Sequence, residues 1–389
     1  MHSATKIVSP HTRRLKLRKI STSKSLMKEN LKKVKAEERP QTKKILAIVA
    51  ICAAVLVIGV MFWQGLGKQG FSKTVKDSFM GEEVAVSPTP FPFQEMTIDY
   101  LRDRDYKSTL GTREMLSENE SYTSYFTSYD SDGLKINGLL TVPKGEEPEG
   151  GWPAIVFIHG YIPPTIYQTT ENYVAYVDSL ARSGFVVFKI DLRGHADSEG
   201  EPSGAYYSSD YIVDARNAIS ALEESGFVNP EKIGLWGHSM AGNVVMRTVA
   251  SKRDVPAAVI WGGAVYTYED WQKYGIQDNS YRPPGMSTQR QRRRDELFGA
   301  YGEFDNKSEF WRKVAPTNYL TGLKTSIQLD HAVDDDVVNI GYSRDLAEIL
   351  EREKIDYEFN EYPSGGHNIQ GASFNQAMTD TIEFFKAKL

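Results

Sequence analysis

From Pro153 onward, short apolar segments alternate with segments of helical periodicity, and this alternation limits the possible folds more than any other feature. The apolar segments read AIVFIHG, FVVFKID, KIGLWGHS, AAVIWGG, SIQLDHA and DYEFNEY. The helical segments between and after them read YVAYVDSLARSG, YIVDARNAISALEESG, MAGNVVMRTVASK, YSRDLAEILERE and FNQAMTDTIEFFKAKL. Nearly continuous apolar strands joined by helices predict an α/β fold, with a mostly parallel sheet covered by helices on both faces.

One stretch, residues 264–325, breaks this alternation. It carries many aromatic residues and the basic run RQRRR, but little strand pattern. Open parallel sheets bind their ligands at the carboxyl ends of the strands. We therefore expect residues 264–325 to form a mostly helical cap insertion over that edge. Its aromatic residues are expected to pack the cap onto the sheet, and the alternative is that they line an apolar acyl pocket.

A second strong feature is the stretch 45–63, which reads ILAIVAICAAVLVIGVMFW and carries no charge. Its 19 residues would span roughly 28 Å as a helix, close to the thickness of a bilayer's hydrocarbon core. Lys43 and Lys44 precede it and Trp63 ends it, as residues at a membrane interface do. A buried core helix would show a polar face, and a cleaved signal peptide would have a shorter basic region and an A-x-A site. We therefore predict a single transmembrane helix, an uncleaved signal anchor.

The charge distribution predicts the orientation of this anchor. Residues 1–44 hold 14 Lys and Arg against 3 Asp and Glu, whereas the rest of the chain holds 32 against 48. Because basic flanks stay in the cytoplasm, the N-terminus is predicted to be cytoplasmic and residues 64–389 extracytoplasmic. The tail has no aromatic residue to stack on bases and no nucleic-acid motif, so we interpret it as a disordered juxtamembrane segment at the cell membrane that binds no nucleic acid.

The rest of the chain divides into a linker and one domain. Residues 64–94 are rich in Gly, Ser, Pro and Lys and predict an extracytoplasmic stalk, and residues 95–389 form the predicted domain. The segment YTSYFTSYDSDGLKINGLLTVPKG alternates and turns at Asp132 and Gly133, which predicts a hairpin. The only cysteine, Cys52, lies in the membrane stretch, so the outer part has no disulfide and no thiolate to act as nucleophile or metal ligand.

The segment GLWGHSMAG places Ser239 at a sharp corner between an apolar strand and a helix. Gly237, Ala241 and Gly242 flank it, and such small residues are needed where a strand and a helix pass close together. A strand, a tight turn and a helix around a serine are typical of a nucleophile elbow, which exposes the serine hydroxyl above the sheet. We therefore interpret Ser239 as a candidate nucleophile.

A serine hydroxyl needs a base to accept its proton and an acid to orient that base. On sheets of this kind, the chain order is Ser, then the acid, then His. Only two histidines follow Ser239, and His331 ends the strand that should itself supply the acid. His367 lies in YPSGGHN, a glycine-rich loop after the last strand, and is the predicted base. His159, in the loop after AIVFIHG, is interpreted as structural.

The acid and the oxyanion donors are predicted from loops at the same edge. The loop DHAVDDDVVN offers four carboxylates, and the physics of the sequence alone does not choose among Asp330, Asp334, Asp335 and Asp336. An oxyanion hole needs two donors aimed at the developing negative charge. The predicted donors are the backbone N–H of Met240, directly after the nucleophile, and that of Tyr161.

The ordered set FIHGY, DLRGHADSEG, GLWGHSMAG, LDHAVDDDVV and YPSGGHN resembles the α/β-hydrolase superfamily, and is most similar to prolyl-oligopeptidase-like and dienelactone-hydrolase-like serine hydrolase domains. The resemblance covers about residues 120–389 and implies that residues 95–389 are an α/β-hydrolase catalytic domain. The family pattern H-G-x-x-D-D-x-V-P, laid on His331 to Asn339, implies Asp335 as the catalytic acid, with Asp334 as the alternative. It also implies that Asp191 and Arg193 support the fold near the site.

The chain departs from the family at several points. Ala196 and Ala241 replace usual glycines, and Asn339 replaces the usual proline. Residues 64–119 are too few for the propeller of the oligopeptidases, and no acidic pair is evident that would bind a substrate amine. Strict dipeptidyl-peptidase activity is therefore not predicted.

These residues together predict a membrane-anchored, extracytoplasmic serine hydrolase, serine-peptidase-like, acting through an acyl-enzyme on an ester or peptide bond. Its expected substrate is a small ester or a short peptide. No metal or organic cofactor is required by this chemistry, and no metal-ligand spacing is visible. One alternative is a carboxylesterase, and another is a non-catalytic binding protein on the same fold. The catalytic triad Ser239, Asp335 and His367 is complete, which favours an enzyme.

Overall fold

A computed structural model describes residues 90–276 and 288–389 of the chain. Residues 1–89, which hold the predicted tail, the predicted membrane anchor and most of the predicted stalk, lie outside these ranges, as do residues 277–287 of the predicted cap. Within the described ranges, no helix combines the length and the apolarity needed to cross a bilayer.

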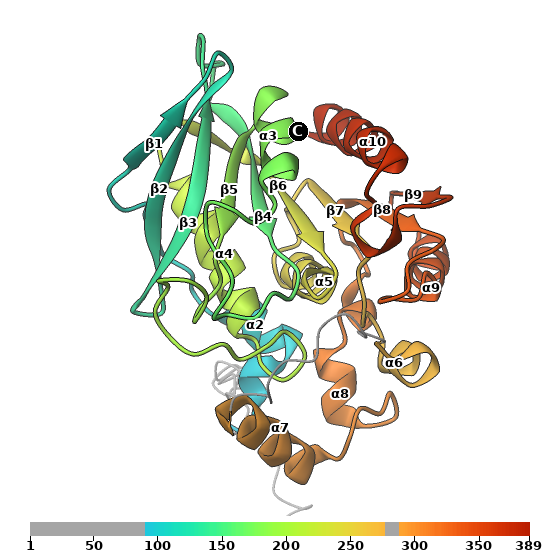
Figure 1. The fold of residues 1–389 in the computed structure, drawn as a ribbon. Helices are drawn as coiled ribbons and strands as arrows, with labels where there is room; N and C mark the ends of the chain where they lie inside the picture. Colours follow the sequence, from blue (N-terminus) through green and yellow to red (C-terminus); the bar gives the residue numbers. More distant parts are fainter. Residues whose placement is uncertain (1–89, 277–287) are drawn as a thin grey trace, which may run out of the picture. The chain divides into compact units, whose positions relative to one another are not determined.

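A nine-stranded sheet forms the centre of the described domain, in the order β1-β2-β3-β5-β4-β6-β7-β8-β9 (Figure 1). Three antiparallel strands form one side: β1 (Glu114–Glu118), β2 (Tyr122–Ser131) and β3 (Leu134–Pro143). The other strands are parallel to one another: β4 (Trp152–Ile158), β5 (Val186–Ile190), β6 (Val228–His238), β7 (Ala257–Trp261), β8 (Ser326–Ala332) and β9 (Tyr357–Tyr362). The predicted α/β fold with a mostly parallel sheet is therefore confirmed.

The antiparallel side contains the predicted hairpin, formed by β2 and β3. Its turn residues Asp132 and Gly133 have φ values of 57° and 79°. A two-residue turn with both φ angles positive matches the twist of the strands it joins, and Asp-Gly is a favoured pair for it.

The parallel strands separate two cores, because successive side chains of a strand point to opposite faces. Ala154, Val156 and Ile158 of β4 lie in the core under α4 (Asp210–Glu223), α5 (Ala241–Ser251) and α9 (Gly341–Arg352). Ile155 and Phe157 lie in the core under α3 (Val174–Arg182) and α10 (Ala372–Lys388). Figure 1 shows α3 and α10 beside each other on that face. These five side chains of β4 are fully buried, as expected for a strand covered on both faces.

The segment between β7 and β8 is helical where it is described. It contains α6 (Tyr268–Tyr274), α7 (Thr288–Tyr301), α8 (Glu309–Val314) and the 3₁₀ turn η2 (Pro316–Tyr319). These elements have a core of their own, to which Tyr268, Phe304 and Trp311 contribute stacked and edge-on aromatic rings. The 3₁₀ turn η1 (Gln94–Met96) adds Met96 to this core, and α2 (Ile98–Asp103) packs against α5.

The parallel strands bring distant parts of the chain to one edge. Ser239 follows β6, Asp335 follows β8, and His367 lies in the 3₁₀ turn η3 (Gly366–Asn368) after β9. Because β6, β7, β8 and β9 are adjacent and parallel, their carboxyl ends meet, and the three predicted triad residues share this edge.

Candidate active site

Ser239 occupies a strained turn between β6 and α5. Its φ is 57°, in the left-handed region that residues other than glycine rarely adopt. Its N–H donates to the Trp261 carbonyl at 2.9 Å. The flanking glycines are required for space. A Cβ on Gly237 would lie 2.7 Å from Val245, and one on Gly242 would lie 2.8 Å from the Gly263 Cα. The local geometry is therefore that of a nucleophile elbow.

The three predicted triad residues lie in one hydrogen-bonded chain. His367 Nε2 is 2.8 Å from Ser239 Oγ, and His367 Nδ1 is 2.8 Å from Asp335 Oδ2. With the ring proton on Nδ1 facing the carboxylate, Nε2 is left as an acceptor for the serine hydroxyl. The arrangement can therefore take a proton from Ser239.

Asp335 is held as a carboxylate by several donors. Its Oδ1 accepts the N–H groups of Val337 and Val338, each at 2.9 Å, and its Oδ2 accepts from His331 Nε2 at 3.1 Å. Burial alone would raise the pKa of the Asp335 carboxyl, but the hydrogen bonds from His331 and His367 outweigh it and hold that pKa below its usual range. The side chain is 1% exposed, so the negative charge faces His367 with little screening by water.

The four carboxylates of the predicted acid loop have different surroundings. Asp334 accepts the N–H groups of Gly365 and Gly366 and does not contact the imidazole of His367 in the structure. Asp330 is fully buried and accepts from Asn360, Tyr362 and Thr381. Asp336 is exposed. Asp335 is the carboxylate of this loop that contacts His367.

His331 has a role near the acid that the sequence analysis did not assign. Its Nε2–H faces Asp335 and the carbonyl of Val338, at 3.0 Å from the latter, while Nδ1 lies 2.8 Å from Ser343 Oγ. It is fully buried. His331 therefore fixes the rotamer of Asp335. It lies near the end of strand β8, and no local sequence pattern indicates this contact.

The predicted oxyanion donors flank the nucleophile. Met240 is the N-cap residue of α5, at a helix end where the N–H groups have no intrahelical acceptor. Tyr161 follows β4 and Gly160, and both Tyr161 and Met240 line the same cavity as Ser239. Both residues thus line the cavity that contains Ser239, and the helix end adds a favourable dipole for an anion.

A cavity of about 710 Å³ opens at Ser239. Its walls come from the loop after β4, the loop before α4, the segment between β7 and β8, and the loops that carry Asp335 and His367. The lining residues are Gly160, Tyr161, Ile162, Pro163, Ile166, Asn172, Tyr173, Tyr176, Tyr206, Tyr207, His238, Ser239, Met240, Trp271, Ile276, Val337, His367, Asn368 and Gln370. These walls are mostly aromatic and aliphatic, and the lining includes no Asp, Glu, Lys or Arg of the described residues.

The loop that forms one wall of this cavity is tied to the end of β5 by a buried polar group. Lys189 Nζ donates to the Thr169 carbonyl at 2.6 Å and to Tyr167 Oη at 3.1 Å. Asp191 accepts from Tyr167 Oη at 3.0 Å and from Thr169 Oγ1 at 2.6 Å. Burial lowers the pKa of Lys189 to about 8 and raises that of Asp191 to about 6. Sequence reasoning missed Lys189, which stands in an apolar strand without any motif.

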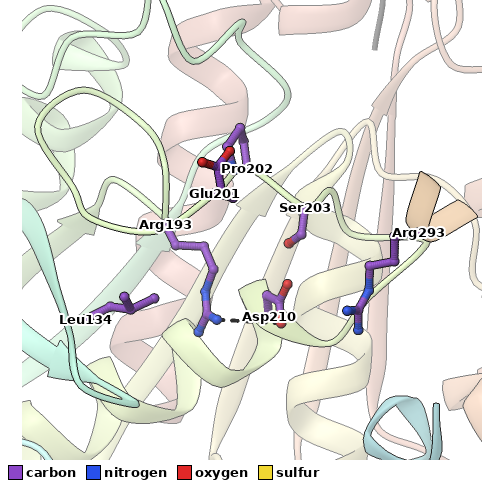
Figure 2. A pocket seen from close by; sticks show the side chains of 7 residues that line it. All are labelled: Leu134, Arg193, Glu201, Pro202, Ser203, Asp210 and Arg293. Carbon is purple, nitrogen blue, oxygen red and sulfur yellow. Dashed lines mark ion pairs between the residues drawn. The ribbon is translucent and has the colours of Figure 1, made fainter. Parts of the chain in front are cut away.

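Arg193 supports the loop after β5, as the resemblance implied. It donates to Asp214 with Nε and Nη2, at distances down to 2.7 Å, and pairs more loosely with Asp210 at 3.5 Å. Figure 2 shows the ion pair between Arg193 and Asp210, with Arg293 beyond Asp210. All three residues line a smaller cavity of about 250 Å³. Arg293 is paired with Glu95 at 3.0 Å. Both guanidinium groups are thus engaged, which indicates a structural role for this cluster.

Within residues 90–276 and 288–389, no group of three or more His, Cys, Asp or Glu side chains is arranged to hold a metal ion.

Comparison with known proteins adds a family match. The family described as "Serine aminopeptidase, S33" matches residues 153–279. The uncharacterized peptidase YuxL of Bacillus subtilis is 25% identical over 61% of this chain and 34% of its own length. The prolyl endopeptidase FAP of Homo sapiens is 26% identical over 55% of this chain and 26% of its own length. The chain therefore spans only about a third or less of the length of these curated relatives.

Solved structures show the same fold. The acetyl xylan esterase from Paenibacillus sp. R4 has a TM-score of 0.54 at 17% identity, covering 75% of this chain and 92% of the esterase. A puromycin-hydrolyzing peptidase of Mycobacterium tuberculosis has a TM-score of 0.53 at 19% identity, covering 70% of this chain and 40% of the peptidase.

The fold, the hydrogen-bonded arrangement of Ser239, His367 and Asp335, and the partial family match are all similar to those of serine hydrolases of peptidase or esterase type. The chain is similar to proteins of the α/β-hydrolase superfamily, which its motifs also resemble, and the family match is confined to residues 153–279.

Proposed function

We propose that this chain cleaves an ester or amide bond in a substrate whose acyl side is uncharged and apolar. The observation that carries the proposal is the hydrogen-bonded chain from Ser239 through His367 to Asp335, set in the wall of an apolar cavity of about 710 Å³.

The chemistry follows from these contacts. His367 Nε2 accepts the Ser239 hydroxyl proton while Oγ attacks the carbonyl carbon, forming a tetrahedral intermediate. Asp335 holds the imidazole in the required tautomer and stabilises its charged form. The imidazolium then gives its proton to the leaving oxygen or nitrogen, whose bond to the carbonyl carbon breaks. Water then loses a proton to His367 and attacks the acyl carbon. The bond from that carbon to Ser239 Oγ breaks, the imidazolium returns the proton to Oγ, and the acid is released.

The N–H groups of Met240 and Tyr161 are the proposed oxyanion donors. Negative charge appears on the carbonyl oxygen only as the tetrahedral intermediate forms, so donors fixed in advance stabilise the transition state more than the substrate. Met240 stands at the start of α5, and hydrogen bonds from Thr169 to Asp191 and Lys189 tether the loop after β4 that carries Tyr161, which supports this proposal.

The cavity lining favours an uncharged substrate. A free N-terminal amine is protonated near neutral pH, and burying it without a carboxylate partner is costly. No described residue of the lining is Asp or Glu. The peptidase relatives favour an amide bond, and the lining without carboxylates favours a peptide whose N-terminus is blocked. The esterase with the same fold keeps an ester as the second candidate.

Matched substrates test this proposal. For phenylalanine p-nitroanilide with and without an N-acetyl group, we expect kcat/KM at least about tenfold higher for the acetylated compound, because its amide needs no counter-charge. A p-nitrophenyl ester of hexanoate beside one of succinate makes the same comparison for esters. Labelling by a fluorophosphonate reports the nucleophile independently of the substrate.

A preference for the free amine or for the succinate ester would overturn the uncharged-substrate proposal while leaving the hydrolase intact. Absence of fluorophosphonate labelling in folded protein would contradict the serine mechanism itself, and would favour the non-catalytic binding protein.

We also propose that residues 45–63 anchor the enzyme in the cell membrane, with residues 64–94 as a stalk and the catalytic domain outside the cytoplasm. The uncharged run and its basic flank support this.

We propose residues 264–325 as a cap, since Trp271 and Ile276 line the cavity beside Ser239.

Protease treatment of cells tests the anchor. In cells whose envelope admits the protease, an epitope after Leu389 is expected to be lost, while one before Met1 is protected. Deletion of residues 1–63 should release the domain from the membrane fraction. Protection of the C-terminal epitope, with loss only after lysis, would overturn the outward orientation.

A further inference from the structure

The proposed mechanism does not use Tyr173 and His238. These two residues lie between the loop that carries Tyr161 and the loop that carries His367. Tyr173 lies directly before α3, and its hydroxyl is 3.0 Å from the backbone nitrogen of Gly160 and 2.7 Å from His238 Nδ1. His238 is the last residue of β6, and its Nε2 is 2.8 Å from the carbonyl oxygen of His367. Three segments far apart in the sequence are thus joined by three hydrogen bonds.

The direction of these bonds follows from the chemistry of the groups. The His367 carbonyl can only accept, so His238 Nε2 carries the proton. The Gly160 N–H can only donate, so it donates to Tyr173 Oη, whose own hydrogen is then directed at His238 Nδ1. With the single ring proton of His238 on Nε2, each of the three hydrogen bonds has one donor and one acceptor. His238 is 2% exposed, and its burial lowers its pKa to about 3, which keeps the ring neutral with this single proton.

Both ends of this connection adjoin reacting groups. Gly160 directly precedes Tyr161, a proposed oxyanion donor. The carbonyl at the other end belongs to His367, the proposed base. The His238 and His367 rings also touch, with centroids 4.6 Å apart. A shift in either loop would therefore move a donor or the base relative to Ser239.

The residues around the hydrogen bonds of Tyr173 and His238 are closely packed. A Cβ on Gly160 would lie 2.8 Å from Tyr173 Oη and 2.9 Å from His238 Nδ1. The loop after β4 thus approaches the tyrosine and the histidine as closely as a glycine backbone allows. Phe157 and Trp236 enclose Tyr173 with edge-on contacts, at centroid distances of 5.4 Å and 6.1 Å.

We propose that Tyr173 and His238 are positioning residues that fix the oxyanion loop and the base loop relative to each other. The proposal rests on the proposed function, since it concerns the same reaction. Neither side chain exchanges a proton with the substrate. Their hydrogen bonds keep the Tyr161 N–H and the His367 imidazole in place while charge develops, where an error of about 1 Å costs on the order of 100-fold in rate.

Substitution of Tyr173 by phenylalanine is the direct test. It removes one hydroxyl and leaves the Gly160 N–H and His238 Nδ1 without their partner. We expect kcat to fall about 10- to 100-fold while KM changes less than about threefold, because the lost interaction concerns the transition state. Tyr122→Phe is the matched control: it removes a hydroxyl bonded to Asp178, away from the cavity, and should leave kcat within about twofold.

His238 supplies a rescue test that a purely structural role would not pass. In His238→Gln the amide can donate to the His367 carbonyl and accept from Tyr173, so activity should stay within about fivefold of wild type. His238→Leu fills a similar volume without either bond and should lose about as much kcat as Tyr173→Phe. The double variant Tyr173→Phe/His238→Leu should lose little more than either single variant, because both break one connection.

The result that overturns the proposal is full kcat in folded Tyr173→Phe and His238→Leu. Equal losses in His238→Gln and His238→Leu would also overturn it, because shape and not hydrogen bonding would then matter. Thermal melting of each variant separates a loss of fold from a loss of rate. These outcomes require a wild-type protein that labels with fluorophosphonate, so failure of the proposed function would be seen separately.

Discussion

Replacing Ser239 with alanine is expected to lower kcat by at least about 10⁴-fold and to abolish fluorophosphonate labelling. The hydroxyl is the atom that attacks, and no neighbouring group of the described cavity can replace it: the lining contains no other serine and no cysteine. The remaining rate should be that provided by substrate binding and the oxyanion donors alone. Steady-state kinetics and gel-based labelling of purified protein measure both effects.

Folding should survive this change. Alanine keeps the Cβ and loses a hydroxyl that is hydrogen-bonded to the His367 side chain, and the backbone at φ 57° is held by the bond from the Ser239 N–H to Trp261. Ser179→Ala on α3 is the matched control and should retain full labelling. A Ser239→Ala protein that still labels like wild type would place the nucleophile elsewhere.

The order of the chemistry along the chain could be predicted because a parallel sheet converts sequence order into spatial order. Ser239 and His367 each follow a strand, and in a sheet of parallel strands both positions come to the carboxyl edge. A strand–turn–helix pattern with small residues around Ser239 is readable from local sequence alone. The separation of 128 positions between the two residues does not prevent this prediction.

The choice among four carboxylates was beyond local sequence. Asp334 and Asp335 are neighbours in one loop, yet one binds backbone N–H groups and the other the imidazole. Only the turn geometry, fixed by the N–H groups of Val337 and Val338 and by His331, aims Asp335 inward. A resemblance to known sequences implied the correct contact, whereas periodicity and composition contain no such information.

The residues that form the walls of the cavity also could not be predicted from the sequence. Ile166, Tyr206 and Tyr207 come from loops without periodicity. They line the same cavity only because the folded sheet brings these loops together. Two roles were open for the aromatic residues of the cap: packing onto the sheet, which was favoured, and lining an apolar acyl pocket. Tyr266 and Tyr268 are indeed buried, while Trp271 lines the cavity. The link from Tyr173 to His238 joins groups 65 residues apart through single atoms, which no pattern predicts.

A matched pair of substitutions, Asp335→Asn and Asp334→Asn, should give opposite results. In Asp335→Asn, the side chain keeps its size but would present either an amide N–H or a neutral oxygen to His367 Nδ1, so the ring loses the carboxylate that fixes its tautomer and stabilises its charge. We expect kcat to fall about 10⁴-fold. In Asp334→Asn, one oxygen remains to accept the Gly366 N–H, and kcat should fall less than about tenfold.

Both substitutions lie in the same loop, so a change in the conformation of the whole loop would lower kcat in both variants. Each removes one negative charge near His367, which means that a simple change in electrostatic potential would also lower both rates. Only a direct bond between carboxylate and imidazole predicts a difference of about a thousandfold between neighbouring positions. If Asp334→Asn were the inactive variant and Asp335→Asn the active one, the acid would be Asp334, and the loop would adopt another turn during catalysis. If both kept full kcat, the imidazole would need no carboxylate from this loop, and the proposed triad would be wrong.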